Sequence, residues 1–167
     1  EEKIEVLSRQ YQKVWYMSDG IYSIYGDGAP LKQLVGLLNK YAQFYLYVDD
    51  AHGMSWAGIH GRGYVLDQID YQPKMCLATS LAKGFGSTAA ALVFPDEKMK
   101  EIVKLSGAPF IFSNPPAPGI LGAIMGSADI HLSSEIYSRQ QQLRNLIDHF
   151  ITTCYQLDLP LIKDDLT

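Results

Sequence analysis

Five short apolar runs along the chain predict buried β-strands. They do not alternate between apolar and polar positions, and they lie at residues 14–17, 44–48, 75–78, 89–94 and 110–112. Uninterrupted runs of this length are typical of strands that are covered on both faces, as in a mostly parallel sheet. A glycine-rich turn is all that separates the third run from the fourth, and so short a connection permits only an antiparallel pair.

Helical patterns fill the intervals between these runs. Apolar positions three and four residues apart predict helices at residues 1–11, 31–43 and 134–156. A further helix opens in the stretch 115–119, and another follows Pro95, with Asp96 as its N-cap and Gly107 as its stop. Strands separated by helices predict an α/β fold, a mostly parallel sheet with helices on both faces.

The composition is that of an ordinary folded protein. The 167 residues suffice for one domain with a core, and 47% of them are hydrophobic and 19% charged. A formal net charge of −4 without a basic stripe argues against nucleic acid as the main partner. No apolar run approaches the roughly 20 residues of a membrane-spanning helix, and the first residues do not resemble a signal peptide. Cys76 and Cys154 are too distant for a metal motif, and as reduced core residues they favour a cytoplasmic protein.

One lysine follows the third strand, in the stretch from Thr79 to Ser87. Burying an ammonium group is costly unless it is paired or neutralised, so Lys83 needs a reason to follow an apolar run. A lysine amine in a dry pocket can lose its proton and form a Schiff base with an aldehyde. Taken alone, the stretch favours the ordinary interpretation, a loop lysine that reaches solvent.

Other polar side chains follow the strands, at the edge where ligands bind in open parallel sheets. Ser23 comes after the first strand, Asp49 and His52 after the second, and Ser80 just before Lys83 after the third. Pyridoxal phosphate needs such a set: a lysine for its aldehyde, a carboxylate for its ring nitrogen, a polar group beside its phenolic oxygen and hydroxyls for its phosphate. Together these residues favour a site for this cofactor.

Four ordered segments carry a family resemblance. They are residues 18–31, 48–53 (Val-Asp-Asp-Ala-His-Gly), 60–63 (His-Gly-Arg-Gly) and 80–86 (Ser-Leu-Ala-Lys-Gly-Phe-Gly). Their order and spacing resemble those of the α-oxoamine synthases, a family that includes 8-amino-7-oxononanoate synthase, 5-aminolevulinate synthase, glycine C-acetyltransferase and serine palmitoyltransferase. The resemblance extends over residues 1 to 160 and implies part of the large domain of a fold-type I pyridoxal-phosphate transferase, in aminotransferase class I/II.

The resemblance implies a role for each matching residue. Lys83 would bind the cofactor as a Schiff base and later move the proton of the substrate's Cα. Asp49 would pair with the pyridinium nitrogen, and His52 and Ser23 would lie beside the phenolic oxygen. Ser80, where the family commonly has threonine, would bind the phosphate through its hydroxyl.

The resemblance also implies a reaction and an assembly. Such enzymes condense an amino acid with an acyl-CoA thioester, with loss of carbon dioxide, and are homodimers with the active site at the subunit interface. Ser113 falls where the family has a hydroxyl-bearing segment that reaches the partner subunit's phosphate. Because family members are much longer, we expect this chain to be a fragment, inactive by itself. Residues 1–146 would come from the large domain, and residues 147–167 would lead into the small C-terminal domain.

Two other interpretations stay open. An aminotransferase or a lyase on the same fold would use the same lysine and aspartate, and a catalytically silent homologue would act as a subunit. The segment 53–58 comes near the pattern of a nucleophile elbow, but its second glycine comes one residue late, so we reject that interpretation. A metal site built from the aspartates and histidines after the second strand would give Lys83 no role. The remaining histidines are expected to be structural or exposed: His60, His131 and His149.

Overall fold

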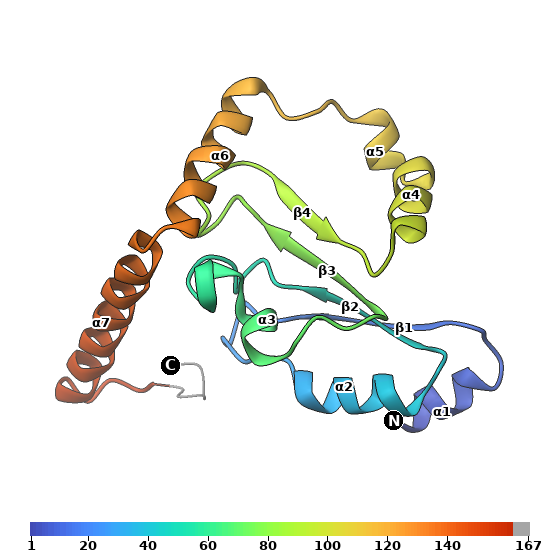
Figure 1. Cartoon of the computed structure of the whole chain (residues 1–167). Helices are drawn as coiled ribbons and strands as arrows, with labels where there is room; N and C mark the ends of the chain where they lie inside the picture. The colour runs from blue at the N-terminus through green and yellow to red at the C-terminus, as the bar shows by residue number, and fades with distance from the viewer. Residues whose placement is uncertain (162–167) are drawn as a thin grey trace.

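Residues 1–161, the part of the chain that the computed structural model describes, form a four-stranded sheet with helices around it (Figure 1). The strands lie side by side in the order β1 (Val14–Asp19), β2 (Phe44–Asp49), β3 (Met75–Ser80) and β4 (Ala90–Val93). β1, β2 and β3 are parallel, and β4 returns antiparallel to β3. The prediction of an α/β fold with a mostly parallel sheet is confirmed, and so is the antiparallel return.

The core lies on the face of the sheet that α2 (Leu31–Lys40) and α3 (Tyr64–Gln68) cover. Every second side chain of β2 is fully buried on this face, because successive residues of a strand point to opposite sides. The buried side chains of β2 form one cluster with apolar side chains of both helices: Phe44, Leu46, Val48, Leu31, Leu34, Leu38 and Val65. A shift of β2 by one residue relative to its neighbours would turn these side chains away from the helices. The core therefore fixes the register of the strands, and with it the residues at which they end.

The opposite face of β1 and β2 is aromatic and less covered within the described residues. Trp15 and Tyr45 pack there with ring centroids 5.0 Å apart, and the side chain of Met17 is 68% exposed.

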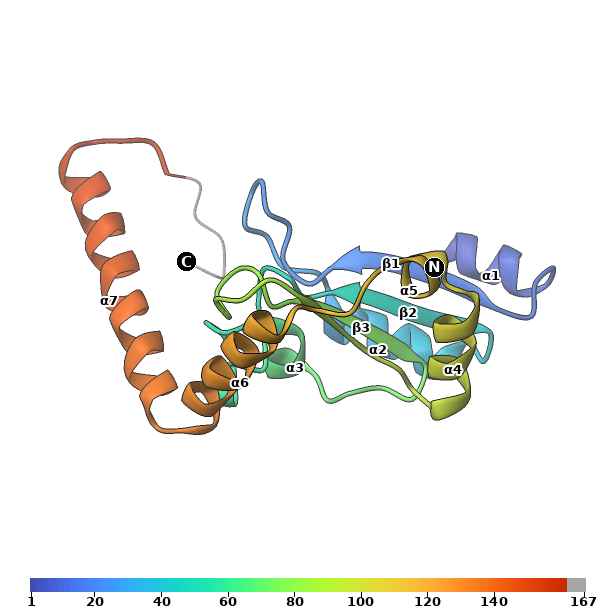
Figure 2. The ribbon, with the colours of Figure 1, turned by 90° about the horizontal axis from the view of Figure 1, so that it is seen from above.

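The remaining helices lie before β1, between β2 and β3, and after β4. They are α1 (Glu2–Ser8), the short 3₁₀ turn η1 (Ile59–Gly61), α4 (Glu97–Ser106), α5 (Ala108–Phe112), α6 (Pro118–Leu132) and α7 (Glu135–Gln156). The end of α6 packs against η1 and the turn between β3 and β4, whereas α7 lies farthest from the strands (Figure 2). No helix within residues 1–161 has the length and apolar character needed to span a membrane.

The predicted limits of α4 are confirmed. The Asp96 carboxylate accepts a hydrogen bond from the backbone N–H of Met99 at 2.7 Å, and Gly107 follows the last residue of the helix. The strand predicted at residues 110–112 was wrong, because these residues end the helix α5. Pro109 in its first turn has a backbone φ suited to a helix start and lacks an N–H that would have no helical partner there. The short helix α3 lies where no element was predicted.

Candidate active site

The three parallel strands end at one edge of the sheet. β2 ends at Asp49, which the register pairs with Asp19 at the end of β1 and with Ala78 near the end of β3. The turn that carries Lys83 leaves the same edge, since it joins β3 to β4 (Figure 1). The fold therefore delivers Asp49 and Lys83 to neighbouring strand ends, where ligands bind in open parallel sheets.

Asp49 is held in place by the turn that follows β2. Its side chain points to the sheet face opposite the core and is half-buried. Oδ1 accepts a hydrogen bond from the N–H of Ala51 at 2.9 Å, and the Asp49 carbonyl accepts one from the N–H of Gly20 at 2.7 Å. The first contact orients the carboxylate, and the second joins the backbone at the ends of β1 and β2.

Lys83 and His52 are in direct contact. Lys83 Nζ lies 2.8 Å from His52 Nε2, although the two residues belong to the separate turns after β3 and β2. Lys83 is exposed and His52 is half-buried among the residues that the structure describes. His52 therefore orients the Lys83 amine, which stays exposed to water.

The lysine turn has its own internal hydrogen bonds. Ser80 Oγ accepts one from the N–H of Ala82 at 3.1 Å, and the Lys83 carbonyl accepts one from the N–H of Gly86 at 2.9 Å. Gly86 has a φ of +79°, in the left-handed region that glycine adopts without a steric penalty. The Ser80 hydroxyl thus helps to shape the turn that presents Lys83.

Ser23 and Ser113 lie apart from the contact between Lys83 and His52. Ser23 is exposed in the loop after β1 and lines a separate cavity of about 360 Å³, together with Asp19. Ser113 follows α5 in extended, exposed backbone, and Figure 1 shows α5 at the end of the sheet away from the lysine turn. Within one chain, Ser113 is therefore remote from Lys83.

Asp50 is a candidate that sequence reasoning did not single out. Its side chain is 1% exposed, and this burial raises the pKa of its carboxyl to about 7. A hydrogen bond from the N–H of Val65 to Oδ2, at 3.0 Å, opposes the rise, and the neighbouring charge of Asp49 adds to it. Oδ1 has no hydrogen-bond partner among the described residues. The fold thus buries a carboxyl group directly beside the candidate site.

Glycines make room for the Asp50 carboxyl group. A Cβ at Gly20 would lie 2.8 Å from Oδ1, one at Gly53 would lie 2.2 Å from Oδ1, and one at Gly63 would lie 2.1 Å from Oδ2. Gly20 follows β1, Gly53 lies in the turn after β2, and Gly63 precedes α3. These glycines are the sequence signal that could have indicated a buried side chain at Asp50. Gly53 directly follows His52, so the cradle of Asp50 is part of the turn that presents the imidazole.

A second buried polar contact also escaped sequence reasoning. His131 of α6, expected to be structural or exposed, is buried and is hydrogen-bonded through Nε2 to the hydroxyl of Ser55. The two residues are 76 positions apart, so no local pattern joins them. They line a cavity of about 380 Å³ that the residues after Lys83, Gly84 and Phe85, also border.

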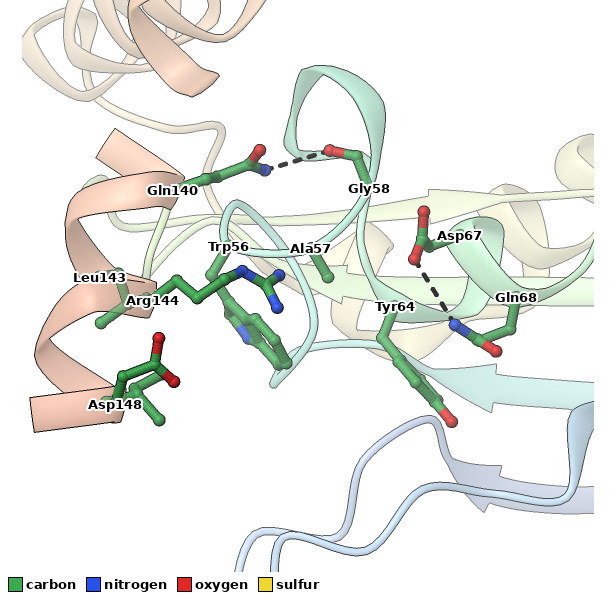
Figure 3. A pocket seen from close by; sticks show the side chains of 11 residues that line it. Trp56, Ala57, Gly58, Tyr64, Asp67, Gln68, Gln140, Leu143, Arg144 and Asp148 are labelled. Carbon is green, nitrogen blue, oxygen red and sulfur yellow. Dashed lines mark hydrogen bonds between the residues drawn. The ribbon is translucent and has the colours of Figure 1, made fainter. Parts of the chain in front are cut away.

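The cavity shown in Figure 3 does not include the candidate catalytic residues. It measures about 230 Å³ and lies between α7 and the segment 56–68, where Gln140 Nε2 donates to the Gly58 carbonyl at 3.1 Å. Asp49, His52 and Lys83 do not line it. Among residues 1–161, no three His, Cys, Asp or Glu side chains gather in a way that could hold a metal ion.

The sequence of the chain matches a protein family and is similar to curated proteins. The family model described as "Aminotransferase class I and II" matches residues 2–166. The chain is 31% identical over 150 residues to 8-amino-7-oxononanoate synthase of Marinomonas sp. (strain MWYL1), covering 89% of this chain and 37% of that protein. It is 35% identical over 130 residues to the enzyme of the same name from Bordetella petrii, covering 78% and 32%. The chain therefore spans about a third of the length of these curated relatives.

Solved structures share the fold. Serine palmitoyltransferase from S. paucimobilis, solved with PLP and myriocin bound, superposes with a TM-score of 0.71 at 24% identity, over 86% of this chain and 37% of that one. An 8-amino-7-oxononanoate synthase from Francisella tularensis also gives 0.71, at 23% identity, over 99% of this chain and 48% of that one. At these identities the likeness shows that the sheet and its helices follow the same architecture.

Proposed function

We propose, because the chain belongs to the aminotransferase class I and II family, that it is the cofactor-anchoring part of a pyridoxal-phosphate enzyme that condenses an amino acid with an acyl-CoA thioester and releases carbon dioxide. The observation that carries the proposal is the 2.8 Å contact between Lys83 Nζ and His52 Nε2, at the edge where β2 ends in Asp49. The names of the relatives, 8-amino-7-oxononanoate synthase and serine palmitoyltransferase, favour the condensing reaction.

The side chains at this edge fit pyridoxal phosphate chemically. A primary amine, a half-buried carboxylate, an imidazole and a serine hydroxyl lie on adjoining strand ends and turns. None of the ion pairs within residues 1–161 includes Lys83, so its amine is available to an aldehyde. A carboxylate at the end of the adjacent strand supplies the opposite charge that a protonated ring nitrogen needs.

Each residue has its own task in the proposed reaction. When bound, pyridoxal phosphate supplies the electron sink for the bonds at the substrate's Cα. Lys83 would bind the aldehyde carbon through Nζ and, after the amino acid displaces it, would move the proton at that Cα. Asp49 would accept a hydrogen bond from the ring nitrogen and keep it protonated. His52 would orient Nζ and lie beside the phenolic oxygen, and the Ser80 hydroxyl would bind the phosphate.

The remaining predicted residues and the assembly are also part of the proposal. Ser23 would join His52 beside the phenolic oxygen, and Ser113 would reach the phosphate of the partner subunit in a homodimer. The exposure of Ser113 and its distance from the lysine turn suit a role across a subunit interface. Two buried free thiols, at Cys76 and Cys154, suit a reducing compartment such as the cytoplasm.

The domain division stays a proposal as well. Residues 1–146 would belong to the large domain, and residues 147–167 would lead into the small one. The last six of these, 162–167, lie outside the described residues.

Covalent trapping at Lys83 tests the proposal. The protein, expressed from its complete reading frame, is incubated with pyridoxal phosphate, reduced with borohydride and digested for mass spectrometry. We expect the cofactor on Lys83 and no trapping in Lys83→Ala. The control variant Lys98→Ala removes an exposed lysine of α4 and should trap as well as the wild type. Trapping at another lysine, or undiminished trapping in Lys83→Ala, would overturn the proposal.

The family description favours one further candidate, amino-group transfer on the same site. Release of free thiol from acyl-CoA in the presence of glycine, alanine or serine distinguishes the two reactions. Transfer of the amino group to a 2-oxo acid without thiol release would replace the condensing reaction with transamination. A protein that traps no cofactor at all would instead be a catalytically silent subunit.

A further inference from the structure

We infer that a buried cluster of Ser55, Phe85, Ser127 and His131 positions the Lys83 amine against His52. Ser55 and His131 are thus positioning residues that act on the site without touching its reacting atoms. The inference deepens the proposed function and rests on it only in taking Lys83 as the reacting amine.

The lysine turn is fastened to α6 through Phe85. The Phe85 ring is 7% exposed and stacks on the His131 imidazole, with ring centroids 4.5 Å apart and planes 29° apart. The Phe85 carbonyl accepts a hydrogen bond from Ser127 Oγ at 2.5 Å. Ser127 and His131 lie four residues apart and therefore on one face of the helix. Both the ring and the backbone of Phe85 are thus held, two residues after Lys83.

His131 links this helix face to Ser55. Its Nδ1 lies 2.7 Å from the Ser127 carbonyl, which can only accept, so Nδ1 is the donor in that bond. Nε2 is then left to meet the Ser55 hydroxyl. Both ring nitrogens are therefore engaged, which fixes the plane of the imidazole on which Phe85 stacks.

Ser55 is held in a conformation that it would not adopt freely. Its φ is +83°, in the left-handed region that residues with a Cβ rarely enter. Its N–H donates to the Gly61 carbonyl at 2.8 Å, its carbonyl accepts from Gln140 Nε2 at 3.0 Å, and its hydroxyl bonds to His131. Such a conformation persists only where the surroundings over-determine it, so Ser55 is a fixed point of this loop.

Ser55 meets both turns of the candidate site. Gly84 packs against it so closely that a Cβ on Gly84 would lie 3.0 Å from the Ser55 Cβ. Trp56, the next residue, donates from Nε1 to the His52 carbonyl at 2.5 Å. Because Lys83 is exposed, burial does not hold its amine. The anchoring of the backbone on either side of the Lys83–His52 contact holds it instead.

Competitive acetylation of the cofactor-free protein, read by peptide mass spectrometry, tests this inference. The rate at Lys83 is compared with the rate at Lys74, whose Nζ is tied to the carbonyls of Leu38 and Tyr41 at 2.6 and 2.8 Å, away from the cluster. Ser55→Gly removes the hydroxyl while relieving the positive φ, and His131→Phe keeps an aromatic ring while removing both hydrogen bonds.

We expect the ratio of Lys83 to Lys74 acetylation to rise about five-fold in each variant, because the hydrogen bond between Lys83 and His52 is lost. A factor of about five corresponds to a net contribution of about 1 kcal/mol from that hydrogen bond. His131→Gln, whose amide can still reach Ser55, should keep most of the wild-type ratio. His149→Gln on the exposed side of α7 should keep all of it.

An unchanged ratio in Ser55→Gly and His131→Phe would overturn the inference, and if one of these fails to fold, the other decides. A parallel rise at Lys74 would also overturn it, because that would indicate general loosening. So would an equal rise in His131→Gln, because the bond to Ser55 would then not be what holds the turn. The measurement needs no cofactor, so it stands whether or not trapping at Lys83 supports the proposed function.

Discussion

Replacing Asp50 by asparagine should stabilise the protein at neutral pH and flatten the dependence of its stability on pH. Burial raises the pKa of the Asp50 carboxyl from an ordinary value of 3.8 to about 7. Between these two pH values the carboxyl keeps its proton in the folded state and loses it in the unfolded state. The folded state therefore binds more protons, and the free energy of unfolding falls as the pH rises from about 4 to about 7.

The magnitude follows from the size of this change in pKa. Since one pKa unit corresponds to about 1.4 kcal/mol, the ionised Asp50 carboxylate lowers the free energy of unfolding by about 4 kcal/mol above pH 7, relative to the protonated form. The structure supplies the cause, because the side chain is 1% exposed and Oδ1 has no partner among the described residues. Asparagine has nearly the same shape, carries no charge, and can still accept the hydrogen bond from Val65.

Urea unfolding followed by circular dichroism, at several values between about pH 5 and about pH 8, measures the effect. We expect the wild type to lose up to about 1.4 kcal/mol per pH unit through this group, and Asp50→Asn to lose that much less. Asp70→Asn, which removes an exposed carboxylate, controls for the change in net charge. If the curves of the wild type and Asp50→Asn run parallel over this range, the carboxyl is already ionised in the fold and the reasoning is refuted.

Two further substitutions test other contacts. Asp96→Ala should lower the free energy of unfolding by about 1 kcal/mol, because it removes the side-chain acceptor of the Met99 N–H. In the same urea assay, Asp96→Ser should keep most of the wild-type stability, because serine can also cap a helix. Equal losses of stability in the two variants would exclude a capping role. Asp49→Asn should weaken pyridoxal phosphate binding about ten-fold or more in a spectroscopic titration, because a charge-assisted hydrogen bond contributes about 1.5–3 kcal/mol. Its stability should stay near that of the wild type, because the amide oxygen can still accept from Ala51; unchanged affinity would remove Asp49 from the site.

Local patterns were sufficient to predict the sheet and the position of the lysine. Uninterrupted apolar runs located all four strands, and the short connection between the last two required them to be antiparallel. Parallel β2 and β3 then had to deliver Asp49 and Lys83 to one edge, whatever the details of packing. Residues 110–112 mark the limit of this reasoning. Three apolar residues suit a strand or a helix equally, and Pro109 in the first turn favours the helix.

The residues that support the site could not be read from local patterns. Asp49 and Asp50 are chemically identical neighbours, and only the fold turns one toward the edge of the sheet and buries the other among glycines. Ser55 and His131 meet across 76 positions, and Ser55 adopts a backbone conformation that its residue type does not announce. Such contacts depend on how α6 returns to the sheet, which periodicity alone does not determine.

The antiparallel return of β4 also implies an order of folding. β3 and β4 pair across a short turn, whereas β1, β2 and β3 pair only after crossovers through α2 and α3. Hairpins form in about 1–10 μs, while pairing of distant segments must first overcome the entropy of closing long loops. We therefore expect the turn that carries Lys83 to take shape before β2 brings Asp49 and His52 beside it. The amine would be in place first, and the capacity to hold a cofactor would arise only with the last parallel pairing.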